Sequence, residues 1–358
     1  MAEFFFDYGL FALKLLTIVI AIIAVVAFSV ALGMRSKKSA ESHIEVTRVN
    51  DQIKQLRDTL SATVDEQEFK LELKQRMKAE KAERKAHLKA LKKSAETNEK
   101  KITDEKQKSR VFIIDFDGDI KASAVSSLRQ EITAVLSLAG KTDEVVIRLE
   151  SGGGMVHAYG LASSQLQRIK DQGIALTVCV DKIAASGGYM MACVANKLLA
   201  APFAVIGSIG VVAQIPNFHR LLKKNDIDFE MITAGEHKRT LTMFGENTEK
   251  GREKFIEDIE DTHLLFKQFV SLRRPQLKIE EVATGEIWFG QRALDNALID
   301  GLMTSDEYIV NACAVADVFE VKYKIKKSLA EKLGFALQSA VDGALLKWWD
   351  RGTNSRYL

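Results

Sequence analysis

Several motifs that mark common enzyme classes are absent from this sequence. It has no His-Glu-x-x-His of zinc proteases, no Gly-x-Ser-x-Gly elbow and no complete phosphate-binding loop ending in Gly-Lys-Ser/Thr. The six histidines are scattered, and the three cysteines have neither zinc-ligand nor redox spacing. Cys179 and Cys193 lie in apolar runs and are expected to be small core residues. We therefore expect neither a metal ion nor a cofactor.

Positive and negative charges nearly balance over the whole chain, but they are distributed unevenly along it. The net charge is +3, with −8 in residues 111–320, +7 in residues 35–110 and +5 in residues 321–358. An acidic body argues against nucleic-acid binding, and basic flanks suit the neighbourhood of anionic lipid.

One long apolar run, residues 10–32, is the right length to span a bilayer at about 1.5 Å per residue. The chain starts with Glu3 and Asp7, whereas a cleavable signal peptide would start with positive charge and have a shorter apolar stretch. We therefore predict a retained membrane anchor over residues 1–34. A second run, residues 183–212, is interrupted by glycine pairs and Pro202, which indicates a buried helix and a buried strand.

The two flanks of the body are predicted to be helical. Residues 35–109 contain no proline and consist mainly of charged and other helix-forming residues, which favours a solvated helical arm. Lipid contact is the alternative. The apolar seam in this arm is too short to indicate a coiled coil. The tail, residues 321–358, has an amphipathic pattern that fits a docking helix or an interfacial membrane helix.

Residues 110–320 alternate strand, glycine-rich turn and helix. Strands are predicted at 111–116, 145–149, 174–180 and 229–233, and helices at 123–139 and 156–171. This order indicates an α/β layered fold with mostly parallel strands. Ligands of such folds bind beyond the carboxyl ends of the strands, where Gly153 and Ser186 both fall.

The stretch Ala184-Ala185-Ser186-Gly187-Gly188 combines one hydroxyl with small neighbours. Glycine after the serine allows a ligand close to the backbone, and a helix starting here would direct its free N–H groups at an anionic intermediate. The alternative is a turn in which Ser186 only caps the helix. A serine nucleophile needs a base, and a neutral lysine such as Lys238 could serve, although any lysine is more often an exposed surface charge.

Four ordered motifs make the chain resemble the signal peptide peptidase A family of membrane-bound serine peptidases. They are Ser151-Gly152-Gly153-Gly154, Ala184–Tyr189, Ile206–Val211 and Gly235–Lys238, followed by a closing motif at Gly290, Ala293, Leu298 and Asp300. The resemblance covers residues 110–310. It implies a ClpP/crotonase-like fold, polypeptide substrates and assembly into a homo-oligomer.

By motif position, the resemblance also implies a Ser-Lys dyad. Ser186 is the expected nucleophile, Lys238 the general base, and Ser208 the residue that orients the lysine. The N–H groups of Gly153 and Gly187 are the expected oxyanion hole. Gly152 stands where the family usually has proline, which could loosen the turn.

The expected function is a membrane-anchored serine endopeptidase, and two alternatives remain. A non-catalytic membrane scaffold would keep the fold without using Ser186, and a crotonase-like acyl-CoA enzyme would leave both Ser186 and Lys238 idle. The side of the bacterial inner membrane on which the body lies is open, because Arg35, Lys37 and Lys38 favour the cytoplasm whereas the resemblance suggests the periplasm.

Overall fold

The computed structural model describes residues 42–64 and 109–325, together with positions 13, 14, 17, 74, 75, 78, 81, 82 and 85. The chain divides into two compact units, Glu45–Lys322 and a second unit made of residues 1–44 and 323–358. Nearly all described residues belong to Glu45–Lys322, which contains the sheet core.

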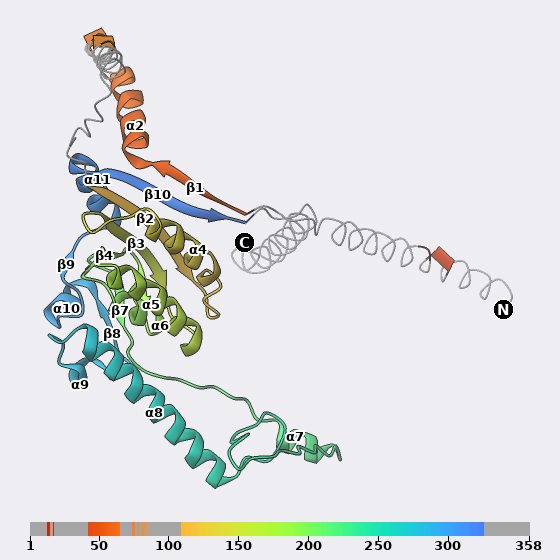
Figure 1. The fold of residues 1–358 in the computed structure, drawn as a ribbon. Coiled ribbons are helices and arrows are strands. Elements are labelled where there is room, and N and C mark those ends of the chain that lie inside the picture. The colour runs from red at the N-terminus through yellow and green to blue at the C-terminus, as the bar shows by residue number, and fades with distance from the viewer. Residues whose placement is uncertain are drawn as a thin grey trace, which may run out of the picture. The chain divides into compact units, whose positions relative to one another are not determined.

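A parallel sheet forms the centre of this unit (Figure 1). In sheet order its strands are β1 (His43–Arg48), β10 (Asp317–Lys324), β2 (Arg110–Gly118), β3 (Glu144–Ser151), β4 (Ala175–Val180), β6 (Lys197–Ala200) and β9 (Gly301–Leu302). From β10 to β9 every neighbouring pair is parallel. Their carboxyl ends therefore lie on one edge.

The sheet divides at the end of β3. Along most of its length β3 pairs with β4, but its last residue, Ser151, pairs with Ala184 of β5 (Ile183–Ala185). β5 continues into a small second layer with parallel β7 (Val205–Gly207) and antiparallel β8 (Ile287–Phe289). This division opens space beside the carboxyl end of β3.

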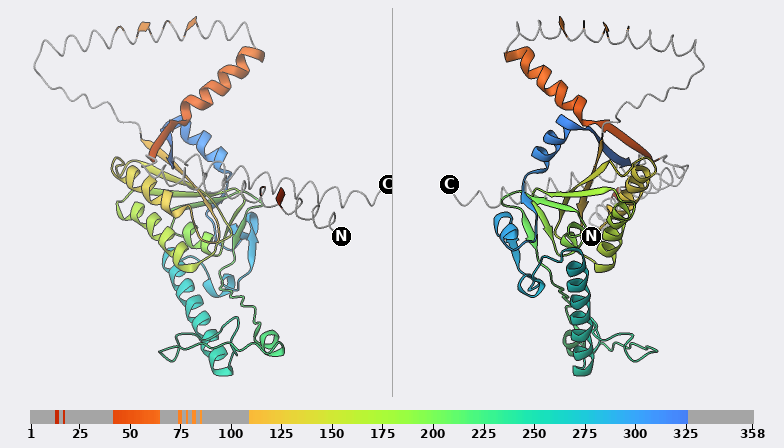
Figure 2. Two further views of the ribbon diagram at one scale, coloured as in Figure 1. Left: turned by 90° about the vertical axis from the view of Figure 1, so that its right-hand side faces the viewer. Right: turned by 60° about the vertical axis from the view of Figure 1, so that its left-hand side comes forward.

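Helices cover both faces of the sheet, because successive strand residues point to opposite sides. Phe116 of β2 faces α5 (Val156–Asp171), which packs beside α4 (Val125–Leu136) and α6 (Gly187–Ala192) (Figure 2). Ile113, on the other face, joins an apolar cluster with Ile309 of α11 (Ser305–Val315). Cys179 is also in that cluster, and Cys193 is buried on α6's side, as predicted for both.

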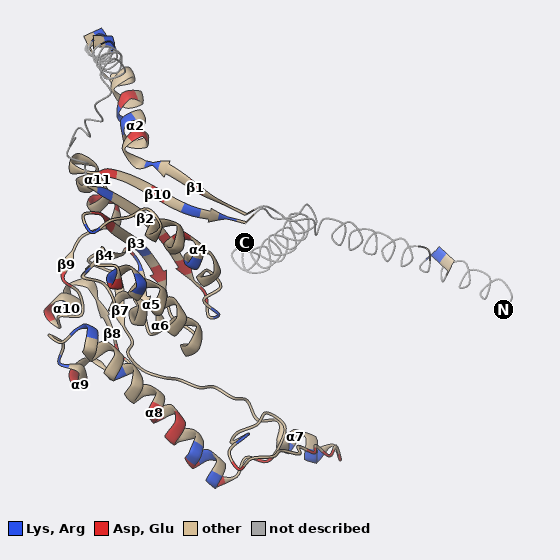
Figure 3. Ribbon diagram, viewed as in Figure 1, with Lys and Arg blue, Asp and Glu red and all other residues tan. Residues whose placement is uncertain are grey.

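The remaining elements follow β7 and lead back to the sheet. They are α7 (His219–Lys224), α8 (Glu249–Arg273), α9 (Ile279–Val282) and α10 (Gly290–Asp295). α8 is a single helix of 25 residues, and its acidic and basic residues are concentrated in the half that begins at Glu249 (Figure 3). Arg274, directly after it, is buried and pairs with Asp300 at 2.9 Å, which fixes the end of α8 to the sheet.

The order of strands, the parallel pairing and the helices at 125–136 and 156–171 confirm the predicted α/β fold. The predicted arm is wrong at its start, where His43–Arg48 is strand β1 at the sheet edge. The helical prediction is confirmed for α2 (Val49–Val64). Its Asn50 side chain accepts a hydrogen bond from the Val318 N–H at 2.8 Å, which connects the start of α2 to β10.

The strand predicted at 229–233 is also wrong, and the reason is physical. These residues are exposed, and no described strand runs beside them to complete a backbone ladder. Most of the predicted anchor (residues 1–34) and of the predicted tail (residues 321–358) lies outside the described residues. Within the part that is described, no helix combines the length and the apolar character needed to cross a membrane.

Candidate active site

Ser186 lies on a strained turn between β5 and α6. Its φ of 51° and ψ of −118° fall in a region that favours glycine, so a serine there carries backbone strain. The turn is held by hydrogen bonds from the Ser186 N–H to the Gly207 carbonyl at 2.8 Å and from the Met190 N–H to the Ser186 carbonyl at 3.0 Å. The side chain makes no capping hydrogen bond. The structure therefore does not support the alternative in which Ser186 only caps α6.

Two glycines bring the backbone of the glycine turn, residues 152–154, against the start of α6. A Cβ on Gly153, whose φ is +88°, would lie 2.6 Å from the Gly187 nitrogen and 2.8 Å from the Ser186 Cβ. A Cβ on Gly187 would lie 2.5 Å from the ring of Tyr159. Neither position has room for a side chain, so packing requires both glycines, and the positive φ adds a second requirement at Gly153.

The two backbone N–H groups predicted to form an oxyanion hole differ in whether they already donate a hydrogen bond within the protein. The Gly187 N–H is at the start of α6 and has no acceptor within the helix. The Gly153 N–H donates to Ser151 Oγ at 3.1 Å. Gly153 could bind an oxyanion only by giving up that bond, whereas the neighbouring Gly154 N–H makes no hydrogen bond within the described residues.

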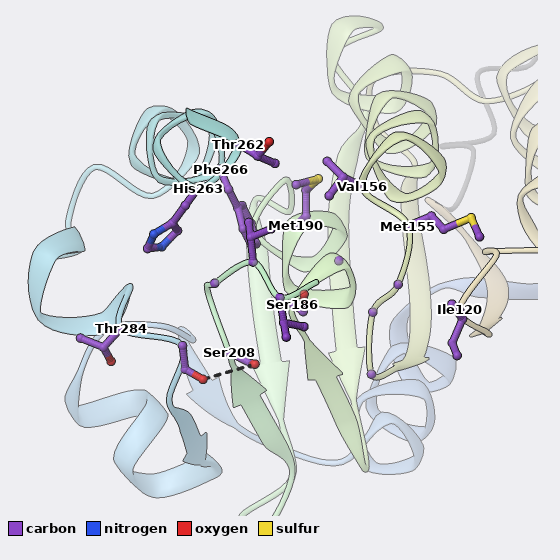
Figure 4. Close-up of a pocket in the computed structure, with 18 residues that line it drawn as sticks. Ile120, Met155, Val156, Ser186, Met190, Ser208, Thr262, His263, Phe266 and Thr284 are labelled. Carbon is purple, nitrogen blue, oxygen red and sulfur yellow. Dashed lines mark hydrogen bonds between the residues drawn. The ribbon is translucent and has the colours of Figure 1, made fainter. Parts of the chain in front are cut away.

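A cavity of about 920 Å³ lies at the carboxyl ends of β3 and β5 (Figure 4). It brings together four of the five predicted site residues: Ser186, Ser208, Gly153 and Gly187. Apolar side chains form much of the rest of its wall, namely Ile120, Met155, Val156, Met190, Val211, Val212 and Phe266. Such a wall suits an apolar side chain of a ligand beside the serine hydroxyl.

Ser208 lies across the cavity from the glycine turn (Figure 4). Its backbone has a φ of 51°, and its N–H donates to the Glu286 carbonyl at 2.7 Å. Its hydroxyl has one long contact, 3.4 Å to the Gly285 carbonyl. That oxygen could therefore turn toward a nearby amine at small cost.

Lys238 is the predicted site residue that the structure does not bring to the cavity. It is exposed and belongs to residues 213–248, which we call the Lys238 segment. Glu236, two residues away, pairs with Lys250 of α8 at 2.6 Å. Lys250 and Thr262 of the cavity wall are 12 positions apart on α8, or about 18 Å along its axis. Figure 1 shows α7 of the same segment at the far end of α8 from the sheet.

His263 is a cavity residue that the sequence analysis did not identify. It lies on α8 one turn before the buried Phe266, and its Nε2 donates to the Ile209 carbonyl at 3.2 Å. His263 and the apolar Phe266 are three residues apart and share a helix face. That spacing could have indicated from the sequence that His263 lies in the cavity wall. His237, which lies in the Lys238 segment, is not part of the cavity wall.

Comparisons with known proteins place most of the chain in one family. Family models match residues 3–166 (Peptidase family S49 N-terminal) and residues 168–318 (Peptidase family S49). A probable protease SohB of Haemophilus influenzae is 53% identical over 331 residues, 91% of both chains. A probable protease SohB of Buchnera aphidicola subsp. Schlechtendalia chinensis is 47% identical over 310 residues, 86% of this chain and 99% of the relative.

A more distant relative, protease 4 of Haemophilus influenzae, is 26% identical over 170 residues, which are 47% of this chain and 28% of that protein. The predicted resemblance to the signal peptide peptidase A family is confirmed, and the relatives of high identity are SohB-type proteases. This chain belongs to peptidase family S49.

Proposed function

We propose that this protein is a serine endopeptidase in which Ser186 is the nucleophile and Lys238 of a neighbouring subunit is the base. The observation that carries the proposal is the strained turn that presents an uncapped Ser186 hydroxyl beside the Gly187 N–H, in a cavity with room for a peptide. Membership of a peptidase family supports it. The divided sheet is consistent with the ClpP/crotonase-like fold that the resemblance implies.

The proposed reaction has two steps. The neutral Lys238 amine takes the Ser186 proton while Oγ forms a bond to the substrate carbonyl carbon, and the backbone N–H groups stabilise the resulting oxyanion. The C–N bond then breaks and the leaving amine receives the proton from Lys238. In the second step Lys238 takes a proton from water and the resulting hydroxide adds to the ester carbonyl carbon. The bond between that carbon and Oγ then breaks, which releases the product acid, and Lys238 returns the proton to Oγ.

A second subunit is required because a single chain does not bring the two residues together. Lysine amines become bases when burial disfavours their charged form. Lys238 is exposed in the single chain, so a neighbouring subunit would have to supply that burial as well as the serine.

The surface around Lys238 supports assembly of this kind. Exposed large apolar side chains on a soluble surface commonly mark an interface. The Lys238 segment exposes nine of them: Ile215, Phe218, Leu221, Ile227, Phe229, Met231, Ile232, Met243 and Phe244.

The cavity wall supports a preference for substrates with a small or aliphatic side chain next to the cleaved bond. Met155, Val156, Met190 and Phe266 line the space beside Ser186. An extended substrate would lie along the glycine turn and use backbone hydrogen bonds for most of its binding.

Mixing two inactive variants tests the proposal. Ser186→Ala and Lys238→Ala should each be inactive alone, and Ser186→Ala should no longer react with a fluorophosphonate probe. Dissociating and reassembling the two together should restore peptide cleavage, because some interfaces then pair an intact Ser186 with an intact Lys238. Lys224→Ala, a substitution in the same segment, serves as the control and should stay fully active.

Each part of the proposal has its own contradicting outcome. Undiminished probe labelling of Ser186→Ala would exclude Ser186 as the nucleophile. Full cleavage by Lys238→Ala would exclude Lys238 as the base. Two inactive variants that never complement would place the dyad within one chain.

A non-catalytic scaffold is the second candidate, and the distance of Lys238 from the cavity along one chain is the observation that favours it. In that case the Ser186→Ala protein should replace the wild type fully in cells. Loss of function in cells with normal protein levels would exclude the scaffold.

We also propose that residues 1–34 anchor the chain in a lipid bilayer, on the basis of their apolar run. Deleting these residues should move the protein from the membrane fraction to the soluble fraction. A reporter fused to the C-terminus would distinguish a cytoplasmic body from a periplasmic one.

A further inference from the structure

Two buried hydroxyl groups lie directly beneath the glycine turn. Ser151 is the last residue of β3 and Tyr159 is in the first turn of α5, so the pair brackets the turn in the sequence. Their oxygens are 2.5 Å apart, and the two residues are 2% and 0% exposed. None of the proposed chemical steps uses either group.

The hydrogen bonds of this pair reach the glycine turn. The Tyr159 hydroxyl donates to the Asp119 carbonyl at 2.7 Å, so its oxygen remains an acceptor for the Ser151 hydroxyl. Ser151 Oγ in turn accepts the Gly153 N–H at 3.1 Å. Burial raises the pKa of the Tyr159 hydroxyl, which keeps this group protonated and able to donate. Ser151 Oγ also lies 3.1 Å from the Gly118 carbonyl oxygen, so its one proton is shared between that oxygen and the Tyr159 hydroxyl. The orientation of the peptide before Gly153 therefore depends on Ser151, which is held in turn by Tyr159 and Gly118.

The same pair also contacts the start of α6. The Tyr159 ring fills the space next to Gly187, where an added Cβ would lie 2.5 Å from its Cγ. An added Cβ on Gly188 would lie 2.4 Å from the Ser151 carbonyl oxygen. Ser151 and Tyr159 thus touch both backbone segments that meet at the serine.

We propose that Tyr159 and Ser151 are positioning residues: by holding the Gly153 N–H they fix the glycine turn against the start of α6, so that the Gly154 and Gly187 N–H groups, unused within the described residues, lie at the separation an oxyanion needs. Neither residue lines the cavity, so neither contacts the substrate. The inference rests on the proposed function for its catalytic consequence, but the positioning itself does not depend on that function.

Removing the Tyr159 hydroxyl tests the inference with little change in shape. Tyr159→Phe keeps the ring against Gly187 and should lower kcat about 10-fold, less than the ~10²–10³-fold loss on removing an oxyanion donor outright. KM should change by less than about twofold, because the effect belongs to the transition state. Ser151→Ala should lower kcat at least as much, and the double variant should be no worse than Ser151→Ala, since both act through one chain of hydrogen bonds.

Tyr308→Phe is the matched control. It also removes a partly buried tyrosine hydroxyl, one that donates to Glu144 at 2.5 Å, on α11 away from the cavity. Its kcat should equal that of the wild type. A Tyr159→Phe enzyme with wild-type kcat, or with a loss no larger than that of the control at equal thermal stability, would overturn the inference.

Amide hydrogen exchange gives a readout that needs no catalysis. Peptides covering residues 152–155 should exchange faster in Tyr159→Phe and in Ser151→Ala than in the wild type or in Tyr308→Phe, while peptides from β2 stay protected. If the wild type is never labelled by fluorophosphonate, the proposed function fails, yet faster exchange still supports the positioning role. Unchanged exchange in both variants contradicts the positioning role whether or not the protein cleaves peptides.

Discussion

The wall of the cavity and the Lys238 segment are built in opposite ways. Around Ser186 the backbone is strained, Gly187 and Tyr159 are buried, and the close approaches at Gly153 and Gly187 depend on the missing Cβ. In the Lys238 segment no residue is buried, α7 is the one helix, and three phenylalanines pack mainly on one another at about 6 Å. One chain can complete the first region by itself, whereas the second has no buried residue, which is why we propose that it packs on a neighbouring subunit.

The largest effect is expected from two substitutions of Lys238 that distinguish a role for its positive charge from a role as a base. Lys238→Ala and Lys238→Arg should both lose at least about 10⁴-fold in kcat, because a guanidinium stays charged and cannot accept a proton. Thermal melting should show no loss of stability for Lys238→Ala, since the side chain is exposed in the single chain and burying a lysine amine in the assembly costs free energy. An active Lys238→Arg enzyme would show that position 238 acts by its positive charge and not as a base.

A smaller effect is expected from adding one methyl group to the cavity wall. Gly153→Ala places a Cβ 2.6 Å from the Gly187 nitrogen at a φ of +88°, so kcat should fall ~10²–10³-fold and the melting temperature should drop. Gly173→Ala is the matched control, with a φ of +73° and only the Lys141 side chain nearby, at 3.6 Å. The control should lose stability by about 1 kcal/mol and keep its kcat. Equal kcat for both variants would contradict the crowded glycine turn.

Charging the Lys238 segment should separate the subunits. Ile232 is 95% exposed, and Ile232→Asp should shift the protein toward monomers in sedimentation experiments and lower activity about 10-fold at micromolar concentration. Leu138→Asp introduces the same charge at a site that is 64% exposed after α4 and should leave assembly intact. Full assembly of Ile232→Asp would mean that the interface lies elsewhere.

The smallest effect concerns the pH dependence of stability, compared between a buried carboxyl at the start of β3 and an exposed one in the Lys238 segment. Burial opposes ionisation of Asp143, but hydrogen bonds from Arg110 and from the Gly140 N–H outweigh it and hold the pKa of this carboxyl below its ordinary value. A lowered pKa in the folded state means that the stabilisation is present near neutral pH and is lost as pH falls below about 3.9.

Chemical denaturation at several pH values checks this prediction. The stability difference between the wild type and Asp143→Asn should be largest near pH 7 and shrink toward pH 3. In the Lys238 segment, Lys250 lowers the pKa of Glu236, but that pair is exposed and screened by solvent, so Glu236→Gln should show no such trend. A pH-independent difference for Asp143→Asn would mean that its ion pair contributes nothing.

Local patterns in the sequence predicted the parts of the fold that depend on local physics. Short apolar runs located β2 to β4, and the glycine after Ser186 indicated the close backbone approach that the structure contains. β1 was missed because its six residues lie in a highly charged stretch, and a strand at the edge of a sheet depends on its partner more than on its own composition.

The sequence predicted four residues that the structure brings to one cavity, but it did not predict that Lys238 lies away from them. The order of the motifs pointed to Ser186 and Lys238. Motif order does not show, however, that the length of α8 separates the Lys238 segment from the cavity. The hydrogen bond from the Gly153 N–H to Ser151 could not be predicted from the sequence either, because it depends on the orientation of a single peptide and not on residue type.

The unusual backbone of Ser186 has a consequence for thermal resistance. A serine held at a positive φ of 51° costs roughly 1–3 kcal/mol of strain that glycine would avoid. Ser186→Gly should therefore melt at a higher temperature than the natural protein, even though it can form no ester with a substrate. Heat tolerance and reactivity would then be competing demands on one pair of torsion angles.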